Sequence, residues 1–143
     1  MIPDESVAYA LAAWSRFDKS VTDDLLRAVS GAFVLVAAAD GELSRAEADR
    51  FLEVVRGKSE VFSRLDFGAL EKTFGDLADA MFGDPQDGKR LALQCVAKVR
   101  DEPEDVALVA GAAKIAADAD GRLQSCETSV MGEIREVLGL RKD

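Results

Sequence analysis

Apolar residues recur along the chain at the spacing of amphipathic helices, and no stretch alternates in the way that a β-strand does. The clearest helix is expected to run from about residue 22 to residue 39, because residues 31–39 are almost wholly apolar. A segment of this kind is usually buried on most of its sides, so we expect it to be the central helix. Other helices are predicted over residues 3–17, 44–57, 66–83, 85–99, 103–119 and up to Gly139, with a short helical turn near 59–65.

Residues typical of helix termini support these boundaries. Ser20 or Thr22 can cap the central helix, and Ser44 with Glu47 has the spacing of a capping box. Each of the three prolines stands where a helix could begin. The sequence therefore predicts an all-α fold, with a single domain over residues 1–143 that contains about seven or eight helices.

One segment occurs twice, and its repetition is the main functional signal in the chain. Residues 40–47 (Asp-Gly-Glu-Leu-Ser-Arg-Ala-Glu) correspond to residues 120–127 (Asp-Gly-Arg-Leu-Gln-Ser-Cys-Glu). Small residues before both copies and apolar residues after them also match. We therefore expect two related halves, about residues 20–60 and 100–140, that pack about an internal pseudo-twofold axis.

The repeated pattern Asp-Gly-x-Leu-x-x-x-Glu is similar to the second half of an EF-hand calcium loop. Asp40 and Asp120 also follow predicted helices, where the negative end of the helix dipole disfavours a carboxylate. One loop supplies about two or three protein oxygens, whereas calcium takes six to eight, so both loops would have to meet. The predicted metal ligands are Asp40, Glu47, Asp120 and Glu127, with Asp118 and Glu42 as further candidates.

A purely structural interpretation explains the same residues without a metal. Asp-Gly is a common turn dipeptide, and Gly41 and Gly121 are free to adopt positive φ after a helix. Ser44 and Glu47 then act only as a capping box. A metal site and a helix–turn–helix joint used twice are therefore both open at this point.

Charge and composition narrow the possible chemistry. The net charge is −9 and no Lys/Arg cluster forms a phosphate-binding stripe, so nucleic acid is not an expected partner. The chain has no histidine, which removes His-based triads and the common zinc sites. Oxygen donors favour calcium, magnesium or manganese over zinc as the divalent metal ion. No nucleophile–base pair is present, so we expect no enzymatic activity.

Cellular location and cysteine chemistry are constrained by similar arguments. Residues 1–5 are acidic where a signal peptide would be basic, and no apolar run is long enough to span a bilayer. We therefore expect a cytoplasmic protein without direct membrane insertion. Two thiols make no disulfide framework: Cys95 is expected in the core, and Cys126 has no counterpart in the first loop.

With both loops placed, the chain resembles the tellurite-resistance TerB family over about residues 25–140. The matching features are the apolar helix of residues 32–39 followed by Asp40-Gly41 and Ser44-x-x-Glu47. Residues 109–121, followed by Glu127, repeat this signature, and residues 134–140 resemble the family's last helix. The second loop departs from an acidic pattern, because Arg122 stands where the first loop has Glu42. Arg122 could pair with a site carboxylate and weaken metal binding.

The resemblance implies an acidic surface centred on the two loops and a metal-binding role in the cytoplasmic part of a tellurite-resistance or stress-response system. It also implies protein partners, among them an integral membrane protein of the resistance system. We therefore expect a non-catalytic module that binds a divalent cation through its paired loops. The alternative is a metal-independent, acidic helical adaptor whose loops are structural and whose acidic face docks a basic partner.

Overall fold

The computed structural model describes residues 12, 14, 21–38, 44–57, 60, 62, 66–120 (backbone only at 117–120) and 132–139. All regular secondary structure in these residues is helical, which confirms the predicted all-α class. The complete helices are α2 (Asp23–Ala37), α3 (Arg45–Arg56), α4 (Phe67–Gly83), α5 (Pro85–Ala97) and α6 (Pro103–Asp120). Residues 132–137 are also helical. These five helices and one further stretch are fewer than the seven or eight helices predicted for the whole chain.

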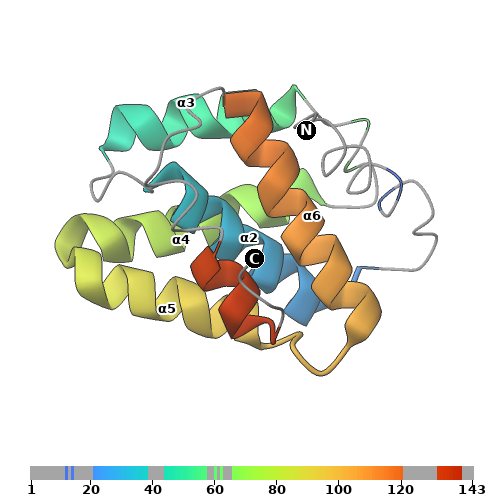
Figure 1. Cartoon of the computed structure of the whole chain (residues 1–143). Coiled ribbons are helices and arrows are strands. Elements are labelled where there is room, and N and C mark those ends of the chain that lie inside the picture. Colours follow the sequence, from blue (N-terminus) through green and yellow to red (C-terminus); the bar gives the residue numbers. More distant parts are fainter. Residues whose placement is uncertain are drawn as a thin grey trace.

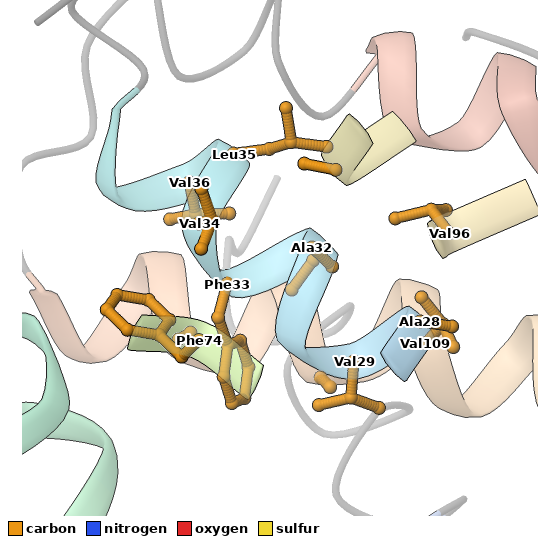
Figure 2. Packing of buried hydrophobic residues seen from close by; sticks show 14 of the residues in the cluster. Ala28, Val29, Ala32, Phe33, Val34, Leu35, Val36, Phe74, Val96 and Val109 are labelled. Atoms are coloured by element: carbon orange, nitrogen blue, oxygen red, sulfur yellow. The ribbon is translucent and has the colours of Figure 1, made fainter. Parts of the chain in front are cut away.

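The central helix is α2, as its apolar sequence predicts. Every residue from 28 to 37 is buried, and α2 contacts α3, α4, α5 and α6. Figure 1 shows α2 in the middle of the bundle. In the close view of the core, Phe74 of α4, Val96 of α5 and Val109 of α6 lie around it (Figure 2). One helix therefore supplies the surface on which the other four described helices pack.

Side-chain caps fix the starts of the helices where the sequence predicted them. Thr22, rather than Ser20, caps α2, and its hydroxyl accepts a hydrogen bond from the Leu25 N–H at 3.1 Å. Asp66 caps α4. Asp84 ends α4 and also caps α5, whose first residue is Pro85. Gly139 adopts a positive φ of 83° directly after the last described helix, as expected for a helix terminus.

Two helix ends differ from the predicted ones. The central helix ends at Ala37 rather than Ala39, because Ala38 already has non-helical dihedral angles while its N–H bonds to the Val34 carbonyl. In the other direction, α6 continues to Asp120, one residue beyond the predicted Ala119. The backbone of Asp120 is therefore helical, whereas Asp40 lies beyond the end of α2.

Two glycines allow the backbone of α5 to lie close to the backbones of α2 and α4. A Cβ atom added to Gly31 of α2 would lie 2.6 Å from the Ala92 carbonyl oxygen of α5. A Cβ atom added to Gly88 of α5 would lie 2.5 Å from Met81 Cα of α4. Real side chains do not approach backbone atoms this closely, so α5 packs against α2 and α4 backbone to backbone at these points.

An aromatic cluster fixes α3 to the rest of the core. The Phe51 ring of α3 stacks on Phe74 with centroids 5.9 Å apart, and it meets the Phe33 edge at the same centroid distance. All three rings are almost completely buried. Such pairs add to the burial of apolar area, so these rings are the principal link between α3, α2 and α4.

Trp14 is a core anchor. Its side chain is buried, its Nε1–H donates a hydrogen bond to the Leu108 carbonyl at 3.0 Å, and its ring meets Phe62 edge-on. The indole therefore joins the region before α2 to α6 while its polar atom is satisfied. No helix in the described part of the chain is both long and apolar enough to cross a membrane.

The described helices agree with the repeat in part. Helices α2 and α6 begin at equivalent positions, Asp23 and Pro103, and the equivalent residues Ala32 and Ala112 are both fully buried. The second loop, residues 121–131, lies outside the described residues. The pseudo-twofold axis and the repeat halves therefore stay predictions.

Candidate metal centre

Glu47 is the only predicted ligand whose side chain falls within the described part of the chain. It lies in the first turn of α3 and is half-buried. Its Oε1 accepts a hydrogen bond from the Ser44 N–H at 3.0 Å, and the Ser44 hydroxyl accepts one from the Glu47 N–H at 3.1 Å. The predicted capping box is therefore confirmed, and the Glu47 carboxylate reaches back toward the loop that precedes α3.

The capping box is compatible with a second role of the same carboxylate. An ionised carboxylate has about four lone-pair directions, and the Ser44 N–H uses one of them. Ser44 and Glu47 also stand three residues apart, as do positions nine and twelve of a calcium loop. Glu47 is thus held in a defined rotamer at the position where such a loop places its last ligand.

The capping box makes a separate prediction about stability. Ser44→Ala should lower the free energy of unfolding by about 1 kcal/mol, because the Glu47 N–H loses its side-chain acceptor. Urea denaturation followed by circular dichroism measures this change. Ser44→Asp is the control and should stay close to wild type, since aspartate caps equally well. An unchanged Ser44→Ala protein would show that the cap contributes nothing to α3.

Helix termini create a negative environment around the candidate loops. The first loop follows the C-terminal end of α2, and the second follows the C-terminal end of α6. Neither helix has a basic residue in its last turn, so no cation of its own offsets the negative end of the dipole. The same is true of α4 and α5, so this feature permits a bound cation without identifying one.

The helix that follows the first candidate loop, α3, contacts the helix that precedes the second, α6. These helices are in contact, and Figure 1 shows the C-terminal end of α6 beside α3. The backbone of residues 118–120 belongs to that end of α6. The end of α6 that leads into the second loop thus lies beside the helix that carries Glu47.

The remaining predicted ligands lie outside the described side chains. This applies to Asp40, Glu42, Asp118, Asp120 and Glu127. Among the residues whose side chains are described, no group of three or more His, Cys, Asp or Glu residues could hold a metal ion. The structure therefore places Glu47, and the joint site stays a prediction.

The structure describes the side chain of Cys95, one of the two cysteines. It is half-buried on α5, and burial raises the pKa of its thiol, while Lys98 and Arg27 act in the opposite direction. Cys126 lies outside the described residues.

A groove that the sequence did not predict lies between α5 and residues 132–137. Its volume is about 480 Å³, and Lys89, Arg90 and Arg100 are among its lining residues. The spacing of these cations along the sequence does not reveal the groove, because residues 132–137 supply its other wall. None of the predicted metal ligands is among the described residues that line this groove.

Comparison with known proteins identifies the family. A protein-family model described as tellurite resistance protein TerB matches residues 26–143. Comparisons with curated proteins and with solved structures gave no match. The family match covers most of the chain and includes both Asp-Gly loops. The chain therefore belongs to the TerB family of tellurite resistance proteins.

Proposed function

We propose that this TerB-family chain is a non-catalytic, cytoplasmic module of a tellurite-resistance or stress-response system that binds a divalent cation. The ligands are Asp40, Glu47, Asp120 and Glu127, with Asp118 and Glu42 as further candidates. The observation that carries the proposal is the Glu47 carboxylate, which the capping box holds at the start of α3. The contact between α3 and α6 supports a site that draws on both loops.

Electrostatics give a reason for a cation rather than an empty acidic cluster. Two carboxylates about 4 Å apart repel each other by about 4 kcal/mol at an effective dielectric constant of 20. The negative ends of α2 and α6 add to that repulsion. A divalent cation removes it, and all-oxygen donors suit calcium, magnesium or manganese better than zinc.

The proposed partners are other proteins of the resistance system, including a membrane protein. The net charge of −9 favours basic protein surfaces over nucleic acid. In this role, the cation would set the charge and the rigidity of the surface formed by the two loops. The chain itself would supply no catalytic group.

Glu47→Gln tests the metal proposal with little risk of unfolding the protein. Glutamine can still complete a capping box, so the stability without metal should change by less than about 0.5 kcal/mol. Cation affinity should fall about tenfold or more, because glutamine lacks the negative charge of the ligand. Calorimetric titration with calcium, magnesium, manganese and zinc measures the affinity of each variant.

Two further proteins complete this experiment. Glu53→Gln is the matched control, because Glu53 is exposed about two turns further along α3 and should not affect binding. Asp40→Asn/Asp120→Asn removes one proposed ligand from each loop and should weaken binding more than Glu47→Gln. If both ligand variants bind every cation as wild type does, the site assignment is wrong.

The second candidate function is a metal-independent acidic adaptor. The capping box favours it, because that pair of hydrogen bonds accounts for Glu47 without any metal. Thermal stability separates the two functions, since a ligand at one hundred times its dissociation constant stabilises the native state by about 2.7 kcal/mol. A melting temperature that does not respond to any of the four cations would favour the adaptor.

A further inference from the structure

The groove between α5 and residues 132–137 has an apolar floor. Leu93 and Ala97 lie one turn apart on α5, and Val137 faces them from the other wall. All three are only partly buried, so the protein's own core does not cover them completely. A surface of this kind accommodates the apolar stripe of a helix, which repeats at three- and four-residue intervals.

Cations outnumber carboxylates among the described residues that line the groove, although the chain as a whole is strongly acidic. Lys89, Arg90 and Arg100 are among the described lining residues together with one carboxylate, Glu136, while Glu133 and Asp87 pair with Lys89 and Arg90. The chain carries a net charge of −9, so this concentration of positive side chains is the opposite of its average surface. The charge pattern therefore complements an acidic binding partner.

The rim cations are available to a partner at low energetic cost. Lys89 Nζ lies 2.9 Å from Glu133 Oε2, and both side chains remain more than one-third exposed. Arg90 pairs with Asp87 in the same exposed manner, on one face of α5. Exposed pairs of this kind contribute little, so a partner's carboxylate can replace either acid. Within the described residues Arg100 makes no ion pair and is exposed.

We propose that this groove docks an acidic amphipathic helix of a partner protein. Apolar residues of that helix would contact Leu93, Ala97 and Val137, while flanking aspartate or glutamate residues would pair with Lys89, Arg90 and Arg100. The 13 residues of α5 span about 20 Å, which matches a partner helix of three to four turns.

Both parts of the surface are needed for this recognition. The proposed partner is acidic and the chain has a net charge of −9, so long-range attraction between them is weak. Salt also screens the field of the protein beyond a Debye length of about 8 Å. The apolar floor then provides contact area, and the cations select acidic over basic helices at short range. The described residues that line this surface include none of the proposed metal ligands, so its test uses other variants than the metal titration does.

A designed peptide of about 15 residues, with leucines at helical spacing and flanking glutamates, is a suitable probe. Binding of the fluorescently labelled peptide to the full chain is measured by anisotropy. Arg100→Glu should weaken binding about tenfold, whereas Lys72→Glu, an equal charge change at an exposed position of α4, should leave it within about twofold. Leu93→Ala should weaken binding, and Leu91→Ala on the same helix should not, because Leu91 does not line the groove.

Three results would overturn the proposal. The first is equal binding of a peptide in which lysine replaces every glutamate, since the rim would then select nothing. The second is an NMR titration in which inorganic phosphate or an oligonucleotide shifts the groove amides and the glutamate peptide does not. The third is a dimer of the chain, detected by sedimentation, that Arg100→Glu dissociates, because the groove would then hold a second copy.

Discussion

Gly31→Ala is expected to destabilise the protein by about 2 kcal/mol, although alanine is the better helix former by about 1 kcal/mol. The added Cβ would lie 2.6 Å from the Ala92 carbonyl oxygen and 3.1 Å from Cys95 Cβ. The first of these atoms belongs to the backbone of α5, so the clash cannot be relieved by a rotamer change. The helices α2 and α5 must move apart, and the contacts on both sides of Gly31 are lost with them.

Gly75→Ala is the matched control, because it makes the same chemical change in the middle of α4. A Cβ atom at Gly75 would meet nothing within 4 Å, so this variant should be more stable by about 0.5–1 kcal/mol. Thermal unfolding should show the melting temperature of Gly31→Ala lowered by roughly 5–8 °C and that of Gly75→Ala raised. If both variants shift in the same direction, the backbone contact between α2 and α5 is not as close as described.

Helix positions were predictable because each depends on neighbouring residues. The apolar run of residues 31–39 predicted a central helix, and burial from residue 28 to 37 confirms it. Ser44, Asp66 and Pro85 predicted helix starts through hydrogen bonds or dihedral restrictions that act within one turn. Local chemistry of this kind does not require knowledge of the tertiary fold.

Close helix approach was not predictable, since it depends on residues that are distant in sequence. Nothing in the neighbourhood of Gly31 indicates that Ala92 lies against it. The groove was not predictable for the same reason, because Arg100 and Val137 come together only when α5 and residues 132–137 are packed. Apolar pattern identifies which face of a helix is buried, but it does not identify the partner that buries it.

The candidate site shows the same division between local and distant information. The pairing of Ser44 with Glu47 was predicted from their spacing, and both hydrogen bonds are present. Whether the loops bind a cation depends on the distance between loops about half a chain apart, which no local pattern determines. Glutamate can complete a capping box and can also ligate calcium, so the residue type alone does not distinguish these two roles. A variant that separates these roles, such as Glu47→Gln, distinguishes them.

The attachment of α3 matters for function because this helix carries Glu47. Its surface contacts with α4 include the ion pairs of Arg45 with Asp79, at 3.6 Å, and of Arg56 with Glu71. These side chains are exposed, and such pairs contribute at most about 1 kcal/mol each. Phe51 is completely buried, and truncation of a buried phenylalanine typically costs about 3–5 kcal/mol. The position of α3 therefore depends mainly on this apolar anchor.

Phe51→Ala should consequently lower the free energy of unfolding by about 4 kcal/mol, because it opens a cavity and removes the contacts with Phe33 and Phe74. Urea denaturation measures the loss, and Leu52→Ala on the same helix should cost less, since Leu52 is only partly buried. If Phe51→Ala does not fold, Phe51→Leu can be measured in its place, because leucine should retain most of the stability.

Hydrogen exchange tests whether that loss is local to α3. In Phe51→Leu the amides of α3 should lose protection before those of α2, because α2 keeps its contacts with α4, α5 and α6. A saturating cation should restore protection in α3 if Glu47 is a ligand, since binding then favours the docked helix. Uniform loss of protection across α2 and α3 would contradict the anchoring role of Phe51. Local loss that no cation reverses would instead favour the metal-independent adaptor, with Glu47 serving the helix alone.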